Sequence, residues 1–177
     1  MSYKPIVDIF KDVTDAIRLV YDPVVTGPPV SGGKKPYYLY GHPLEIVNIL
    51  SEKSSNNTLK FEKFPLIVLF QDFPETITLA GRDVSLNLAI ITDTRQDYYA
   101  ADRYTNTFKT ILYPLWDLLI EYMKRNSNID QVTFDYQKTD RLFWGKHGLY
   151  GNDGNIFNDF VDAIEIENLK LHIKEQC

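Results

Sequence analysis

Three aspartates stand close together in the sequence, at Asp93, Asp97 and Asp102. Carboxylates grouped in this way can hold a divalent metal ion or act as acid and base in hydrolysis. The same residues precede a long apolar stripe, and acidic side chains are favoured at the amino end of a helix by its free N–H groups and its dipole. The sequence favours this helix-capping role. A small metal-dependent hydrolase or nucleotide-binding enzyme is the alternative.

The histidines and the cysteine offer no second site. His42, His147 and His172 lie far apart in the sequence, and Cys177 is the only cysteine. No pair has the spacing of metal ligands, so the usual kinds of zinc site are not predicted. His42 precedes Pro43 at a predicted helix start, which favours a surface or capping role, and His147 is expected in a turn. A single cysteine allows no disulfide within the chain, which is typical of a reducing compartment.

Two glycine-rich stretches resemble ligand-binding loops only superficially. The segment GGKK at 32–35 lacks the spacing of a phosphate-binding loop, and Lys35 runs into Pro36 rather than into a helix. The segment GNDGN at 151–155 lacks the aspartate register and the distal glutamate of a calcium loop. We therefore predict no cofactor, no metal site and no enzymatic activity.

The apolar spacing predicts the elements that position these residues. In chain order they are helix 5–21, strand 37–41, a helix from Pro43 to the polar turn 54–57, strand 59–73, a turn 74–83, strand 84–92, helix 103–125, one or two strands within 128–154, and strand 157–173. Strands 59–73 and 84–92 are expected to pair antiparallel. This order is typical of an α+β fold with an antiparallel-rich sheet of about five strands. The N-terminal helix and the long helix pack against the sheet, with the helices on one side.

Four local features refine this prediction. The continuous apolar run at 65–70 is expected to be covered on both faces of the sheet. Gly81 could supply a positive φ in the turn. Near Asn168 the alternating apolar residues shift by one position, from Ile164 and Ile166 to Leu169 and Leu171, which indicates a β-bulge. Residues 23–36 contain four prolines and three glycines, which is typical of a stiff loop or an arm.

The long helix has a proline in its middle, Pro114. A proline inside a helix removes one hydrogen bond and clashes with the carbonyl group four residues earlier, here that of Thr110, at a cost of about 3 kcal/mol. The apolar stripe keeps its register through this point, so we expect the helix to bend and continue along a twisted sheet. The alternative is two helices that meet at Tyr113, with Pro114 at the first position of the second.

Composition limits the class of protein. The chain has 177 residues, is 44% hydrophobic and carries a formal net charge of −5. This length and composition are typical of one globular domain over residues 1–177. The acidic balance argues against a dedicated nucleic-acid binder, because phosphate contacts need a basic face. No apolar run approaches the ~20 residues that a membrane-spanning helix needs.

Two segments carry a resemblance to a known class of protein. These are FPLIVLFQDF at 64–73 and the phrase R-Y-x-x-x-F-K-x-I-L-Y-P-L at 103–115. With the element order over about residues 3–140, they resemble tail-terminator or tail-completion proteins of tailed phages. More closely, they resemble short proteins from the structural-gene clusters of phages and prophages of Bacteroidetes hosts.

The resemblance implies a non-catalytic virion protein. It implies a small α+β subunit that forms a homo-oligomeric ring at the head–tail neck or the tail end, as a terminator, completion or connector protein. The implied partners are further copies of the chain and portal, neck or tail-tube proteins, with assembly in the host cytoplasm and no membrane contact. DNA would pass through the ring without specific binding, and the acidic balance suits such a channel because like charges repel phosphate.

Exposed residues in the loops are the predicted interface. They are Val30, Lys34 and Lys35 in the arm, and Phe73, Ile77 and Leu79 in the hairpin. An apolar hairpin tip is unusual on a monomer, although single exposed apolar residues are normal. A further alternative is a cytosolic adaptor that binds a peptide along an exposed edge of its sheet.

Overall fold

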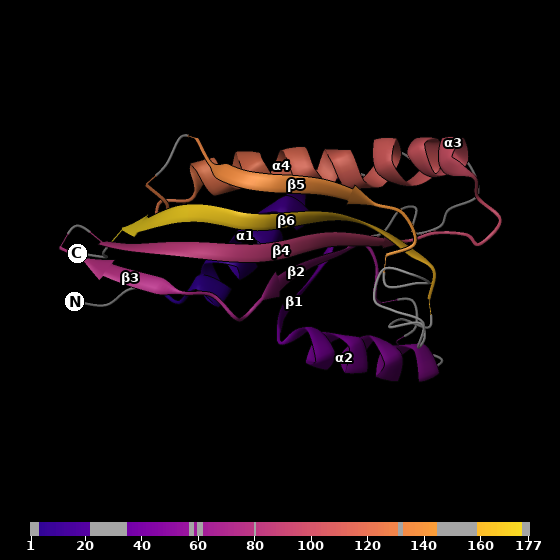
Figure 1. Cartoon of the computed structure of the whole chain (residues 1–177), viewed down its shortest axis with the longest axis horizontal. Coiled ribbons are helices and arrows are strands. Elements are labelled where there is room, and N and C mark those ends of the chain that lie inside the picture. Colours follow the sequence, from indigo (N-terminus) through magenta and orange to yellow (C-terminus); the bar gives the residue numbers. More distant parts are fainter. Residues whose placement is uncertain are drawn as a thin grey trace.

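The computed structural model describes residues 4–21, 35–56, 59, 62–79, 81–130, 133–144 and 159–174. In chain order the elements are α1 (Ile6–Val20), β1 (Tyr37–Gly41), α2 (Pro43–Ser55), β2 (Leu66–Phe70), β3 (Glu75–Thr78), β4 (Gly81–Asp93), α3 (Ala100–Arg103), the π-helical segment η2 (Tyr104–Leu112), α4 (Tyr113–Arg125), β5 (Asp135–Arg141) and β6 (Val161–Lys174). The fold is α+β, as predicted (Figure 1).

The sheet has six strands in the order β1-β2-β4-β6-β5, and β3 pairs with β4 beyond the end of β2. Of the strand pairs that the structure describes, only β1–β2 is parallel. The antiparallel pairing predicted for the strands that became β2 and β4 is confirmed. The sequence prediction missed β3, because it assigned residues 74–83 to a turn. Residues 75–78 read Glu-Thr-Ile-Thr, in which β-branched side chains favour a strand.

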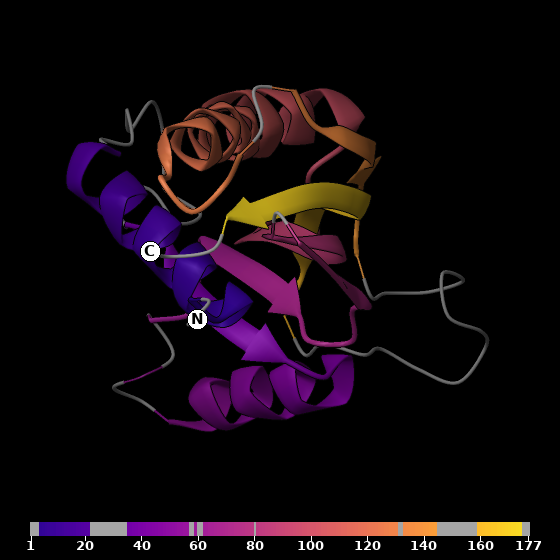
Figure 2. The ribbon, with the colours of Figure 1, turned by 90° about the vertical axis from the view of Figure 1, so that its left-hand side faces the viewer.

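Both faces of the sheet are covered, and the prediction of helices on one side is wrong. Strand β2 turns Ile67 and Leu69 toward one apolar core and Leu66 and Val68 toward another. This confirms that the run at 65–70 is buried on both faces. Helix α1 and the long helix pack on the first face, and α2 packs on the second (Figure 2). A strand that is apolar on both faces needs cover on both.

The larger core lies between the sheet, α1 and the long helix, and we call it the main core. Helix α1 contributes one apolar stripe, and the long helix contributes another. The stripe residues, each at most 4% exposed, are Ile6, Ile9, Phe10, Val13, Ile17, Phe108, Ile111, Leu112, Leu115 and Leu119. Both helices are therefore fixed to the sheet by the spacing of apolar residues that predicted them.

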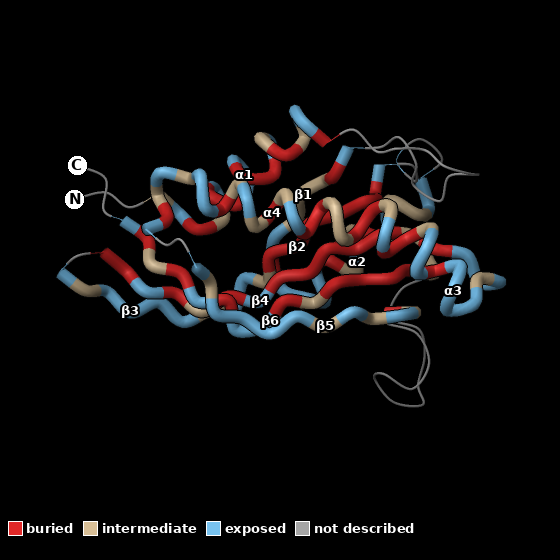
Figure 3. Tube along the Cα trace, turned by 90° about the horizontal axis from the view of Figure 1, so that it is seen from above, coloured by how far each residue is buried: buried red, intermediate tan, exposed pale blue. Residues whose placement is uncertain are grey.

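The smaller core lies on the opposite face. Ile46 and Leu50 of α2 pack there with Trp144 against β2, β4 and the start of β6. Strands β3 and β5 remain largely exposed (Figure 3). Helix α2 therefore covers only part of this face. Of these two exposed strands, β5 is mostly polar, whereas β3 also exposes Ile77.

The long helix continues through Pro114, as predicted. Elements α3, η2 and α4 follow one another without a break from Ala100 to Arg125. The N–H of Tyr113 donates to the carbonyl of Phe108, five residues earlier, and Pro114 lies in the first turn of α4. The backbone hydrogen bonding thus changes from π-helical to α-helical next to Pro114, which has no N–H to donate. A proline is tolerated there because it lies in the first turn of an α-helix.

The bulge predicted near Asn168 is present in β6. Leu86 pairs with Leu169 and Leu88 pairs with Ile166, so two residues of β6 face the single residue Asn87. Asn168 has a φ of +54°, a conformation that asparagine tolerates better than most residues. Its N–H donates to the side-chain oxygen of Asn87 at 2.9 Å, so the extra residue keeps a hydrogen-bond partner.

Candidate functional site

The β3–β4 hairpin forms one end of the sheet, and α3 lies at the other end (Figure 1). At its turn, the hydroxyl of Thr78 donates to the carbonyl of Gly81 at 2.9 Å. Gly81 has a φ of +152°, which confirms the positive φ predicted for it. A Cβ atom at this position would lie 2.3 Å from the carbonyl oxygen of Ile173, so only glycine fits.

The base of the hairpin is anchored to the body of the protein. Arg82 is 9% exposed and forms an ion pair of 2.8 Å with Glu75 of β3. Its guanidinium also donates to the carbonyl of Lys4, just before α1. The hairpin is therefore held by both a strand pairing and a charged hydrogen bond to the body.

The tip of the hairpin is apolar and exposed. Ile77 is 76% exposed and Leu79 is 105% exposed, so both predicted interface residues point into solvent. Phe73, which was predicted with them, is half-buried and packs against the main core. The hairpin thus offers two apolar side chains for contact rather than three.

The other predicted interface residues belong to the loop at 23–36. Lys35 is exposed, two residues before β1. Val30 and Lys34 lie outside the described residues, as does the rest of the loop before Lys35. Their part in an interface stays a prediction.

A hollow of about 380 Å³ opens between α2 and the sheet. We call it the α2 hollow. Its lining residues are His42, Pro43, Ile46, Val47, Phe70, Asp72, Asn87, Leu88, Trp144, Glu165, Ile166 and Glu167. The volume is near the lower end of the range for ligand-binding clefts. The sequence prediction missed this hollow, because its lining comes from five separate segments that only the fold brings together.

The charged groups of the α2 hollow are acidic. Glu165 accepts hydrogen bonds from the guanidinium of Arg141, at 2.6 Å, and from the indole N–H of Trp144. Asp72 and Glu167 are exposed, and within the described part of the chain neither forms an ion pair. The hollow therefore combines an apolar floor with two exposed carboxylates.

The structure does not gather the three aspartates into a metal site. Asp97 forms an exposed ion pair of 2.9 Å with Arg95. The carboxylate of Asp102 accepts from the backbone N–H of Tyr99 at 3.2 Å, which confirms a capping role for Asp102. Among the described residues, no group of three or more His, Cys, Asp or Glu side chains could hold a metal ion.

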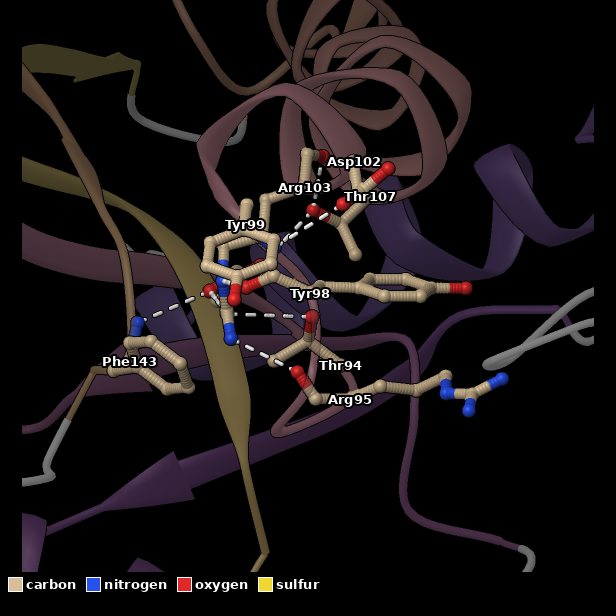
Figure 4. Close-up of polar contacts among 9 residues, drawn as sticks. Thr94, Arg95, Tyr98, Tyr99, Asp102, Arg103, Thr107 and Phe143 are labelled. Atoms are coloured by element: carbon tan, nitrogen blue, oxygen red, sulfur yellow. Dashed lines mark hydrogen bonds and ion pairs between the residues drawn. The ribbon is translucent and has the colours of Figure 1, made fainter.

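A charged side chain is buried where the long helix begins. Arg103 is 1% exposed, and each nitrogen of its guanidinium has a partner (Figure 4). One contacts Asp162 at 2.6 Å and Thr94 at 3.3 Å, and the other two donate to the backbone carbonyls of Tyr98 and Arg95. This arginine ties the loop after β4 to the start of β6.

Asp162, the partner of Arg103, is 0% exposed. Besides the arginine, its carboxylate accepts from the hydroxyl of Thr107 at 3.0 Å and from the backbone N–H of Phe143 at 3.0 Å. The Phe143 ring lies 3.3 Å from the guanidinium carbon (Figure 4). A buried ion pair with this many partners orders four segments around it, and it has no side left open to a substrate.

The histidines have structural partners. His42 accepts a hydrogen bond from the N–H of Leu44 at 3.2 Å, which confirms the predicted capping role. His172 lies 2.7 Å from the carboxylate of Asp83 on the neighbouring strand. His147 lies outside the described residues. In the same described part, no helix is long and apolar enough to cross a membrane.

Two tyrosines of the long helix contact other side chains of the chain. Tyr104 is 53% exposed and packs edge-on against Tyr113. The hydroxyl of Tyr113 donates to the carboxylate of Asp140 on β5 at 2.6 Å, and this hydrogen bond raises the pKa of Tyr113 to about 12. Lys138 lies over the same ring. These aromatic groups link the helix to the edge strand.

Among the described residues, the hairpin tip and the α2 hollow are exposed features that neither core of the fold uses. Comparison with known proteins adds no name to them: no protein-family model, no curated protein and no solved structure matches the chain.

Proposed function

We propose that this chain is a structural subunit of a phage particle, which assembles with copies of itself into a ring at the head–tail neck or the tail end. The resemblance implies a small α+β subunit, and the chain folds as one. The phrase at 103–115 supplies buried residues, among them Arg103, Phe108 and Leu112. The phrase therefore supports the proposal through the fold and not through a reactive site.

The observation that carries the proposal is the exposed apolar tip of an anchored hairpin. Ile77 and Leu79 stand at the end of the sheet with most of their surface in solvent. The glycine turn and the Arg82–Glu75 pair hold them in place. Exposed apolar groups on a rigid projection are typical of a contact with another protein, because they lose little conformational entropy on binding.

The charge of the chain supports the same proposal. A formal net charge of −5 gives the subunit a surface that repels nucleic-acid phosphates on average. A ring through which DNA passes must not bind it, and an acidic subunit meets this need. In this proposal the partners are further copies of the chain and the adjoining portal, neck or tail-tube proteins.

The test is the oligomeric state of the full chain. Size-exclusion chromatography with light scattering should give a mass of several subunits, and electron microscopy should show rings. The double variant Ile77→Ser/Leu79→Ser should shift the mass toward the monomer. The matched control is Leu19→Ser, which changes a leucine that is 82% exposed on α1, and it should leave the mass unchanged.

One outcome would contradict the proposal. A wild-type chain that stays monomeric at every concentration tested, and that binds neither portal nor tail-tube proteins, is not a ring subunit. Purified wild-type chain that turned over a substrate would count against a purely structural role in the same way.

A further inference from the structure

The hairpin tip and the α2 hollow match each other, and they lie on different parts of the sheet. We infer that the hairpin tip of one copy, with Leu79 at its end, inserts into the α2 hollow of the next copy. This inference rests on the proposed function, and it assigns the two surfaces that join neighbouring subunits of the ring.

The apolar groups of the two surfaces are complementary. The tip presents Ile77 and Leu79, and its residues 76–79 carry no charge. The hollow presents Val47, Phe70 and Trp144 among its lining residues. Its volume of about 380 Å³ equals that of roughly a dozen water molecules, which is ample for two aliphatic side chains. Insertion would remove apolar surface from water on both copies.

The base of the tip holds an exposed lysine, and the rim of the hollow holds carboxylates. Gly81, at the base of the tip, is directly paired with Lys174 of β6. Lys174 is half-exposed and contacts Asp130 at 2.9 Å, an exposed pair that can exchange partners at little cost. The rim of the hollow carries Asp72 and Glu167. An uncharged tip with a lysine behind it therefore faces an acidic rim, although the whole chain is acidic.

A tip cannot reach the hollow of its own chain. Gly81 and Leu88 are seven residues apart on β4, which places the tip on the order of 20 Å from the hollow along the strand. The contact must therefore join two copies through two different surfaces. Such a head-to-tail contact repeats from copy to copy and closes into a ring when its rotation permits, whereas a symmetric contact stops at a dimer.

Disulfide trapping tests this contact directly. In a Cys177→Ser background, which removes the only native thiol, the double variant Leu79→Cys/Val47→Cys should form disulfides between copies on mild oxidation. A non-reducing gel should then show a ladder of dimers, trimers and larger species. The two single-cysteine variants, mixed in equal amounts, should give the dimer alone, because each copy then has one half of the contact.

Random collision is controlled by Leu79→Cys/Lys109→Cys, in which the second cysteine lies on an exposed position of the long helix. This pair should form at least tenfold less disulfide at equal protein concentration. Circular dichroism of each variant should match the wild-type spectrum, so that a missing ladder is not due to misfolding.

Charge reversal gives a second readout that needs no cysteine. Glu167→Lys should weaken self-association a few-fold, and Lys174→Glu in the same chain should restore it by pairing the reversed charges across the contact. Lys174→Glu alone should also weaken association. If neither single variant changes the association constant, the charges do not face each other.

The outcomes separate this inference from the function on which it rests. If the wild-type chain forms rings but the Leu79–Val47 pair gives no more disulfide than the control pair, the inference is wrong and the proposed function stands. The inference is equally wrong if variants of the hollow leave self-association intact and abolish binding of a portal or tail-tube protein. A wild-type chain that never associates overturns both.

Discussion

The two ends of the β4–β6 ladder are built in opposite ways. At one end Asp162 and Arg103 form an ion pair without solvent exposure, and every polar atom of the guanidinium has a partner. At the other end a glycine turn holds Leu79 entirely in solvent. The same pair of strands thus ends once in a buried polar network and once in a bare apolar tip.

This contrast separates what the chain uses to fold from what it presents to other molecules. A buried charge suggests an active site when it lies in a cleft, but this one is enclosed by Phe143, Thr94 and Thr107. The apolar residues at the tip have no role in the cores of the chain. Stability should therefore depend on the first end, and association on the second.

The largest effect on folding is expected from Asp162→Ala. It leaves the Arg103 charge buried without its partner, which should lower the free energy of unfolding by about 3–5 kcal/mol. Urea denaturation followed by circular dichroism measures this. The exposed Arg95–Asp97 pair provides the control, because Asp97→Ala should have a far smaller effect. Equal losses in both variants would contradict the contrast between the two ends.

Gly81→Ala should have the next largest effect, at the tip end. A φ of +152° is nearly restricted to glycine, and the added methyl group would meet the carbonyl of Ile173. We expect a loss of about 1–3 kcal/mol in the free energy of unfolding, together with weaker self-association. Ser85→Ala on the same strand should stay within about 0.5 kcal/mol of the wild type. A fully stable Gly81→Ala variant would show that the turn is not strained.

Thr107→Val tests one hydroxyl of the buried end, which lies 3.0 Å from the Asp162 carboxylate and 2.6 Å from the backbone carbonyl of Arg103. Valine keeps the shape of threonine but can donate to neither acceptor, so the free energy of unfolding should fall by about 1–2 kcal/mol. Thr105, two residues earlier on the same helix, is exposed, and Thr105→Val is the matched control with little expected change. Thermal unfolding measures both variants. A neutral result at Thr107 would mean that water or a rotated side chain replaces the hydroxyl.

Leu79→Ser should change folding least and association most. The leucine is 105% exposed, so its replacement should leave the free energy of unfolding within about 0.5 kcal/mol of the wild-type value. The oligomer mass from light scattering should fall. If unfolding in the dilute monomer is strongly destabilised instead, the tip is part of the folding core and the contrast fails.

Much of this fold can be predicted from local pattern. The stripe of α1, the helix start at Pro43 and the parity slip at Asn168 depend on spacing that is visible in the sequence. The burial of residues 65–70 on both faces of the sheet also follows from their apolar composition. It requires that other elements of the chain cover the second face as well as the first. The prediction of helices on one side conflicts with it, and the structure resolves the conflict by placing α2 opposite the long helix.

Other features depend on distant partners and cannot be seen in a local window. Asp162 lies in an alternating segment where an aspartate suggests a solvent-facing residue, and only Arg103, 59 positions away in sequence, makes its burial possible. The wider hydrogen-bonding of η2 has no simple composition signal. The α2 hollow joins residues from α2, β4 and β6 with Trp144, so no single motif marks it.

One residue of β6 decides which side of the last strand faces inward. Before the bulge the even-numbered Ile164 and Ile166 point to the main core, and after it the odd-numbered Leu169, Leu171 and Ile173 do so. If Asn168 stayed in the chain but formed no bulge, the alternation would run on unshifted, and the lysines of the strand would turn inward while its leucines turned to water. Deletion of Asn168 itself would remove the extra residue and keep the later side chains on their faces, whereas a one-residue change between the bulge and the end of β6 would turn the residues after it to the opposite face.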